Sequence, residues 1–146
     1  MGVEQTVSTR NQSTANFDTK RLFIFDNRYV MGVFKNTQAV PAPYDIEAGV
    51  LVVRDTATPG GFKPATSANL ADVVGISAYE GKITLANNET ASLNICTKGT
   101  VEPLYLKFPA GVTLNTAVGN KTLFDVIESL GIHLQQGTVE MTEYDN

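Results

Sequence analysis

Short apolar runs, separated at nearly regular intervals by turn-forming residues, place the strongest constraint on how this chain can fold. Candidate strands cover residues 49–54, 73–78, 82–86, 90–97 and 100–108. Each is followed by residues that favour a turn, such as the Pro and paired Gly after the first strand. Strands that recur about every ten residues, with no long helix between them, are typical of an all-β barrel or sandwich. The length of 146 residues suits one such domain plus an appendage.

The sequence predicts one helix near the C-terminus, at residues 121–130. Four apolar residues spaced i, i+3, i+4 and i+7 give it a single apolar face: Leu123, Val126, Ile127 and Leu130. Asn120 or Thr122 can cap its N-terminus, and Gly131 suits the left-handed position just after its C-terminus. We expect this face to pack on the core, over the mouth of the barrel.

The two ends of the chain are polar and differ from the body. Residues 1–19 hold mainly Ser, Thr, Asn and Gln, so an isolated segment of this kind does not bury enough apolar surface to offset its ordering entropy. Because it contains no Pro and is rich in Thr and Val, it is predicted to be an extended arm that can add as a strand to another protein's sheet. A merely floppy tail is the alternative. The last residues, 137–146, form an acidic C-terminal tail with three acids and no base.

Residues 20–44 change character and become strongly β-prone. Two apolar and aromatic runs within residues 21–34 are separated by the turn-forming pair Asp26-Asn27, which predicts a β-hairpin. Both faces of this hairpin are largely apolar, so we expect the domain core or a partner to cover it on both sides. Two prolines then mark a connector to the β core, residues 45–136.

Charge is unevenly distributed and bears on the choice of partner. Residues 1–40 contain five basic and three acidic side chains, whereas residues 41–146 contain six basic and twelve acidic ones. An acidic body repels phosphate backbones, so no nucleic acid partner is expected. The sequence lacks the run of about 18 apolar residues that a membrane helix needs, and its start does not resemble a signal peptide. We therefore expect neither a membrane partner nor export by a signal peptide.

Residues that usually carry chemistry are sparse, so we expect no enzyme activity, no cofactor and no metal site. His133 is the single histidine, and its place between two apolar strand residues favours a surface or hydrogen-bonded role over catalysis. Cys96 is the single cysteine and is predicted to be a small buried apolar group. Motifs of hydrolases, nucleotide-binding loops and metalloproteases are missing from the sequence, although scattered carboxylates could still meet in space.

Four motifs within residues 48–134 follow one another in an order that carries a family resemblance. They read AGVLVVRDTATPGGFKP, NLADVVGISAYEG, NICTKGTVEPLYLKFPAGVTL and TLFDVIESLGIHL. This order resembles the head-decoration, or capsid cement, proteins of tailed bacteriophages, the family of the lambda-type decoration protein. The resemblance implies a small β-barrel or β-tulip-like domain with one short C-terminal helix and an extended N-terminal arm. The segment of roughly 45 residues before the core departs from the compact family pattern and leaves the geometry of attachment open.

The resemblance also implies a function. Members of this family are virion structural proteins that bind the outer surface of the expanded capsid and stabilise it. It implies the major capsid protein and further copies of this chain, as a homotrimer, as the partners. It places the protein on the virion after synthesis in the host cytoplasm. A head-fibre base, or a carbohydrate- or receptor-binding β module on the virion, is the alternative, with Tyr44, Tyr79 and Tyr105 as candidate contact residues.

The residues expected to make these contacts fall in two groups. The arm is expected to bind the capsid through its larger apolar side chains, Val3, Val7 and Phe17. A second group is expected at an oligomer or capsid interface: Leu22, Ile24, Tyr29, Val33 and Pro109.

Overall fold

The structure, a computed structural model, describes residues 22–37 and 43–135. The predicted arm, the connector around residues 38–42 and the acidic tail lie outside these described residues. The elements are, in chain order, β1 (Phe23–Lys35), β2 (Tyr44–Glu47), β3 (Leu51–Asp55), β4 (Gly61–Pro64), η1 (Leu70–Asp72), β5 (Val73–Ser77), β6 (Lys82–Leu85), β7 (Thr90–Val101), η2 (Pro103–Tyr105), β8 (Ala117–Val118), β9 (Lys121–Thr122), α2 (Leu123–Ser129) and β10 (Ile132–Leu134).

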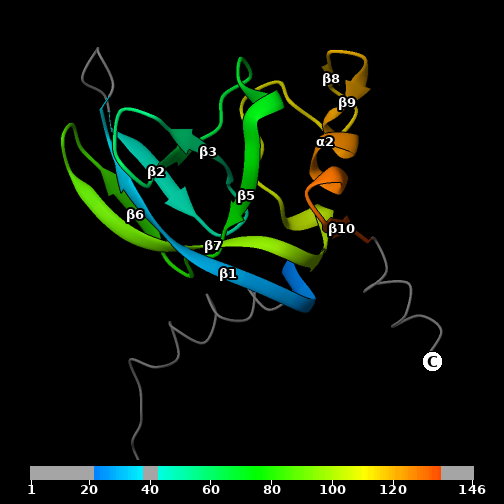
Figure 1. Ribbon diagram of the computed structural model, residues 1–146, viewed down its shortest axis with the longest axis horizontal. Coiled ribbons are helices and arrows are strands. Elements are labelled where there is room, and N and C mark those ends of the chain that lie inside the picture. Colours follow the sequence, from blue (N-terminus) through cyan, green and yellow to red (C-terminus); the bar gives the residue numbers. More distant parts are fainter. Residues whose placement is uncertain (1–21, 38–42, 136–146) are drawn as a thin grey trace, which may run out of the picture.

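The fold is mainly β, as the sequence predicted, and its centre is a closed five-stranded barrel. The strands follow the order β1-β4-β3-β5-β7, and pairing of β7 with β1 closes the ring (Figure 1). The barrel is mixed because β1 runs parallel to β4, whereas the other neighbours in the ring are antiparallel. β10 adds to β7 in parallel outside the ring. β2 and β6 form a separate antiparallel pair.

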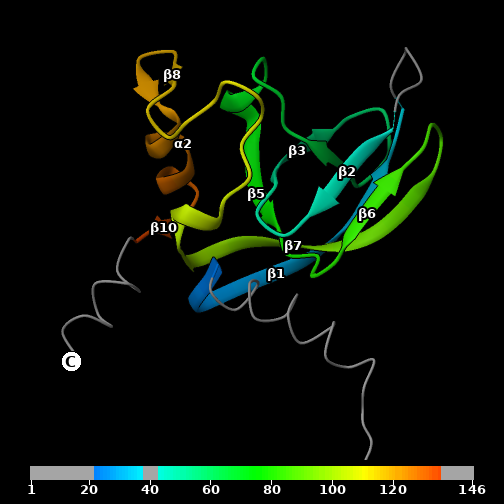
Figure 2. The ribbon, with the colours of Figure 1, turned by 180° about the vertical axis from the view of Figure 1, so that it is seen from behind.

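Two core clusters lie on either side of β3. Leu51 and Val53 belong to the cluster that α2 covers, while Val52 points into the cluster formed with β2 and β6. This alternation follows from the pleat of a strand, in which successive side chains point to opposite faces. Figures 1 and 2 show the matching layout, with α2, β8 and β9 at one end of the molecule and β2 and β6 at the other.

The short helix confirms the prediction for this segment. α2 begins after Thr122, whose hydroxyl accepts from the Asp125 amide while the Asp125 carboxylate accepts from the Thr122 amide, a capping box. Leu123 and Ile127 are fully buried in the cluster beneath the helix. Gly131 has φ +91°, the left-handed conformation expected after a helix end.

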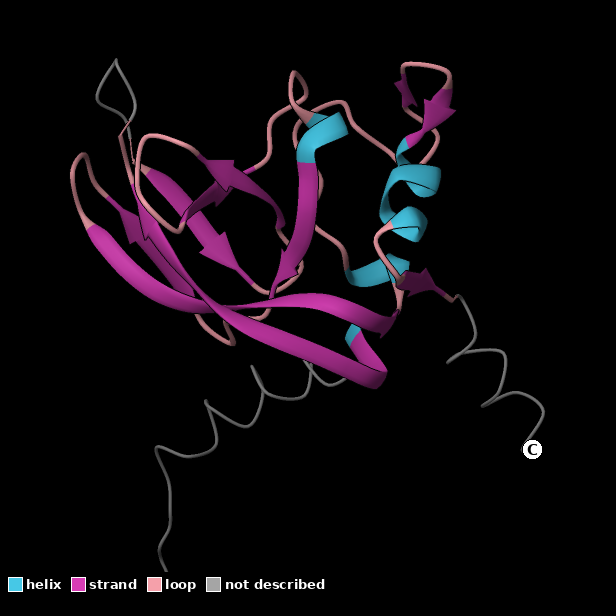
Figure 3. Cartoon of the chain, viewed as in Figure 1, coloured by secondary structure: helices cyan, strands magenta, loops and turns pink. Residues whose placement is uncertain are grey.

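The predicted hairpin in residues 20–44 is wrong. β1 runs as one strand through Asp26 and Asn27 and pairs with β7 along its length (Figure 3). β1 also closes the barrel, so it belongs to the core domain instead of preceding it. The break predicted between the candidate strands 90–97 and 100–108, at Lys98-Gly99, is likewise absent, because β7 continues through these residues and ends at Val101.

The two misassigned turns lie opposite each other and share one physical cause. The ladder pairs Phe25 with Thr100 and Arg28 with Lys98, so two residues of β1 face Gly99 alone in a β-bulge. Asp26 has φ +52° and Gly99 has φ +121°, conformations that Asp tolerates and that glycine adopts freely. The turn-favouring residues therefore bend a two-stranded ribbon without reversing it.

Candidate functional site

The candidate site is built around this kink, where β1, β7 and β10 meet. A Cβ at residue 99 would lie 2.6 Å from the Cα of Asn27, so only glycine fits there without a shift. The Asn27 side-chain amide donates to the carbonyl of Thr100 at 3.1 Å and to the Sγ of Cys96 at 3.7 Å. These contacts fix the two strands together at the bend.

An apolar surface lies on the first two thirds of β1. Its large side chains are between 38% and 71% exposed: Ile24, Phe25, Tyr29, Val30 and Met31. Phe23 and Tyr29 pack edge to face, with ring centroids 5.7 Å apart. We call these five exposed residues the β1 apolar surface. Successive strand residues point to opposite faces, so Tyr29 and Met31 share one face of β1 and Val30 lies on the other. Exposed apolar groups concentrated on one strand are still typical of a strand that a protein partner contacts.

Strand pairing explains why the described residues leave this surface uncovered. β4 pairs with β1 only at Val33 and Phe34, so the preceding residues of β1 have no described strand on that edge. From Gly32 onward the strand is covered, because an added Cβ at this residue would clash with the side chains of Ile95 and Phe62. The apolar sequence of β1 therefore continues beyond the part that the barrel can bury.

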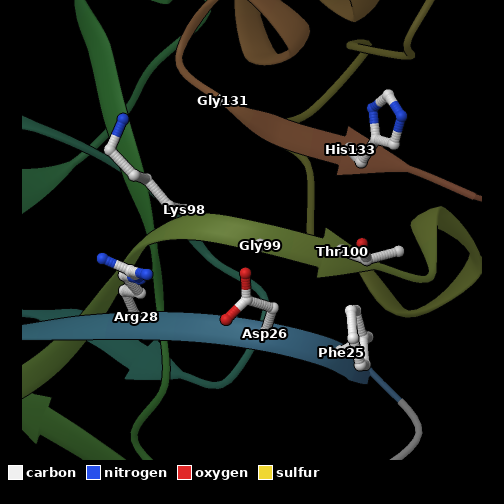
Figure 4. Close-up of a pocket in the computed structure, with 8 residues that line it drawn as sticks. All are labelled: Phe25, Asp26, Arg28, Lys98, Gly99, Thr100, Gly131 and His133. Atoms are coloured by element: carbon white, nitrogen blue, oxygen red, sulfur yellow. The ribbon is translucent and has the colours of Figure 1, made fainter.

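A polar pocket of about 500 Å³ lies beside the kink. Its lining comes from three strands and the turn before β10: Phe25, Asp26, Arg28, Lys98, Gly99, Thr100, Gly131 and His133. Figure 4 shows Lys98 and Arg28 toward one end, and Phe25, Thr100 and His133 toward the other. A second pocket of about 330 Å³ lies next to Met31, between β7 and the segment after β5.

The charges in the polar pocket are only partly balanced. Glu128 accepts from the Leu134 amide at 2.9 Å, and its other carboxylate oxygen lies 3.0 Å from the Nδ1 of His133. Asp26 is the acid that lines the pocket, against two permanent cations, Arg28 and Lys98. Neither cation has an ion pair with any residue in the described part of the chain. The pocket therefore favours an anionic ligand.

The sequence-predicted interface residues do not form one surface. Ile24 and Tyr29 belong to the β1 apolar surface, and Val33 is half-buried farther along the same strand. Leu22 is 1% exposed in the core, so its assignment to an interface is wrong in this structure. Pro109 is half-buried in the loop after η2. Val3, Val7 and Phe17 lie outside the described residues.

Sequence reasoning missed Phe25, Met31 and the pair Arg28–Lys98 as site residues. A signal for the first two was present, since the run around Met31 is apolar without the alternation expected of a half-exposed strand. No sequence pattern near either residue predicts that Arg28 and Lys98 lie side by side, because their pairing depends on the register between β1 and β7.

The predicted roles of Cys96 and His133 agree with their surroundings. Cys96 is buried, and this burial raises the pKa of its thiol despite a hydrogen bond from Asn27. Burial, and then the nearby Cys96, also raises the pKa of Tyr29. His133 lies on the surface beside Glu128. Within residues 22–37 and 43–135, no three His, Cys, Asp or Glu side chains gather as a metal site requires.

Comparison with known proteins adds no assignment. No protein-family model matches the chain, and no curated protein matches it in sequence. In the described part of the chain, no helix is both long enough and apolar enough to cross a membrane.

Proposed function

We propose that the protein is a virion structural protein that binds the outer surface of an expanded phage capsid and stabilises it. The observation that carries this proposal is the β1 apolar surface, which lies on the strand that follows the N-terminal arm. Exposed apolar groups concentrated on one strand favour a protein partner over a small molecule. The motif order in residues 48–134 suggests that this partner is the major capsid protein.

The mechanism is thermodynamic linkage. A protein that binds the assembled shell and not its separate subunits lowers the free energy of the shell alone, and so opposes disassembly. We propose a homotrimer as the bound form. Three linked copies raise the effective concentration of each contact, so weak individual contacts add up to firm attachment.

We further propose that residues 1–19 are an attachment arm that pairs with a capsid strand, with Val3, Val7 and Phe17 as its apolar anchors. Ordering such a segment costs about 1–2 kcal/mol per residue, so it needs a nearly complete ladder of hydrogen bonds. The β1 apolar surface provides a second contact on the folded body.

The alternative, a carbohydrate- or receptor-binding module, has less support. Such sites usually gather exposed aromatic side chains near polar groups. Tyr44 and Tyr79 pack against the cluster that contains Phe34, whereas Tyr105 packs against the cluster beneath α2. The three candidate tyrosines therefore do not share one face.

The test is sedimentation of the purified protein with empty expanded capsids of the phage that encodes it, followed by heating of decorated and bare shells. We expect the protein to pellet with the shells, and decorated shells to lose their integrity at a higher temperature. If the protein binds but both kinds of shell are equally robust, a display or adhesion role replaces the cement role. If it does not bind, the proposal is wrong.

Two further variants locate the contacts. Deletion of residues 2–19 is expected to reduce capsid occupancy at least tenfold, which corresponds to about 1.4 kcal/mol. Met31→Ser is expected to weaken binding as well, whereas Leu104→Ser is the matched control, because Leu104 is 67% exposed and Met31 is 63% exposed. Unchanged binding by the deletion variant would place attachment on the body, on β1 or on the loops at residues 56–63 and 109–114.

A further inference from the structure

We propose that the polar pocket between β1, β7 and β10 is a carboxylate-binding site, and that its ligand is the acidic C-terminal segment of the same chain, residues 137–146. This assignment is independent of capsid binding. It rests on the cations of the pocket, on the position at which the described chain ends, and on the sequence of the segment that follows.

The acidic side chains of the pocket neutralise only part of its positive charge. Lys98 lies over the chain before β10, because a Cβ at Gly131 would be 3.4 Å from the Lys98 Nζ. Arg28 faces Lys98 in the β1–β7 ladder, which holds the two cations on neighbouring strands. Glu128 is already bound to His133 and to the Leu134 amide, and Asp26 offsets only one of the two cations.

The chain leaves the described structure at the rim of this pocket. His133 lines the pocket, and Gln135 is the last described residue, only two positions later. Glu140 follows Gln135 by five positions in the sequence, and five extended residues span about 17 Å. A ligand tethered this closely has a high effective concentration, so even weak contacts would keep the pocket occupied.

The sequence of the segment complements the pocket. Its three acids, Glu140, Glu143 and Asp145, are accompanied by no base. Carboxylates pair well with the planar guanidinium of arginine, which can donate two parallel hydrogen bonds.

Disulfide trapping in the full chain tests this proposal. Thr100 lines the pocket and is neutral, so Thr100→Cys with Thr142→Cys places one thiol in the site and one in the segment. The control pair is Thr113→Cys with Thr142→Cys, because Thr113 is exposed on a different loop. Single-cysteine variants show whether the buried Cys96 reacts. We expect the first pair to form an intramolecular disulfide at least five times faster than the control pair.

Charge reversal then tests the role of the cations. The double variant Arg28→Glu with Lys98→Glu is expected to slow formation of the disulfide at least fivefold. The same slowing is expected for the original pair in 0.5 M NaCl, because the Debye length falls to about 4 Å and screens the charges. Lys63→Glu with Lys121→Glu changes the net charge equally at exposed sites elsewhere and is expected to leave the rate unchanged. Trapping no faster than the control would overturn the proposal. Crosslinked dimers in place of monomers would assign the pocket to a second copy and overturn the same-chain assignment.

Discussion

The two ends of β1 share one strand, one pairing partner and a similarly apolar sequence, yet they differ in burial. Phe34 at the second end is fully buried, whereas Phe25 at the first end is 71% exposed. Both ends pair with β7, but only the second also pairs with β4. Apolar sequence therefore predicts that β1 is a strand, while its neighbours decide which part is core. The uncovered part is where a partner is expected.

The largest expected effect on stability comes from removing a buried side chain at the second end of β1. Phe34→Ala removes a fully buried ring that packs against Phe62, and should lower the free energy of unfolding by about 3–5 kcal/mol. Urea denaturation followed by circular dichroism measures this change. A loss below about 1 kcal/mol would mean that this end of β1 is not core.

The kink that separates the two ends should be the next most sensitive position. Gly99→Ala places a Cβ on a residue with positive φ, and this Cβ would lie 2.6 Å from the Cα of Asn27. The substitution should therefore lower the free energy of unfolding by about 2–4 kcal/mol. Gly111→Ala is the control, since Gly111 also has a positive φ but open space around it. Equal losses in the two variants would show that the close approach of the strands contributes nothing.

Tyr44 extends the comparison to the side chains that cover the buried end. Its hydroxyl is buried and has no hydrogen-bond partner among the described residues, so Tyr44→Phe should raise the free energy of unfolding by about 1 kcal/mol. Burial, and then the charge of Asp55, raises the pKa of Tyr44 to about 12. The neutral form is thus favoured in the folded state, and its contribution to stability is complete below the unfolded-state pKa of about 10.

This contribution of Tyr44 should be lost as the pH rises from about 10 through about 12. The wild type should therefore lose more stability over this interval than Tyr44→Phe. Urea denaturation of both proteins at several pH values provides the measurement, and the difference between them removes the effect of other titrating groups. If the stability of the two proteins changed with pH in the same way, the raised pKa of Tyr44 would be contradicted.

The smallest effect on stability is expected at the exposed end. Phe25→Ala should change the free energy of unfolding by less than about 0.5 kcal/mol, because the ring is mostly in solvent. The same denaturation assay used for Phe34→Ala gives a direct comparison within one strand. A loss close to that of Phe34→Ala would show that residues outside the described part cover Phe25 in solution.

Much of the fold could be predicted from the sequence because its signals are local. The helix followed from the spacing of Leu123 and Ile127 and from the capping residue Thr122, all within one segment. Strands β3, β5 and β6 followed from apolar runs bounded by turns. The hairpin failed because a pair such as Asp26-Asn27 favours both a reversal and a bulge, and only the facing Gly99 distinguishes them.

Less of the candidate site could be predicted, because it depends on contacts between distant segments. Ile24 and Tyr29 were identified from their apolar character, but the same reasoning included Leu22, which the core covers. The cations of the polar pocket, Arg28 and Lys98, are 70 positions apart in the sequence and meet only through strand register. No pattern within either segment indicates that pairing.

The bulge also bears on the risk of aggregation from an apolar strand that has one open edge. Long, flat, exposed edges invite indefinite stacking of copies and lead toward fibrils. The ladder of β1 with β7 becomes regular only at Tyr29, and β4 occupies the edge from Val33 onward. The regular open edge is thus confined to residues 29–32, shorter than the six or seven residues typical of a fibril-forming segment. The bend, together with the cover by β4, therefore discourages edge-to-edge aggregation of copies through β1.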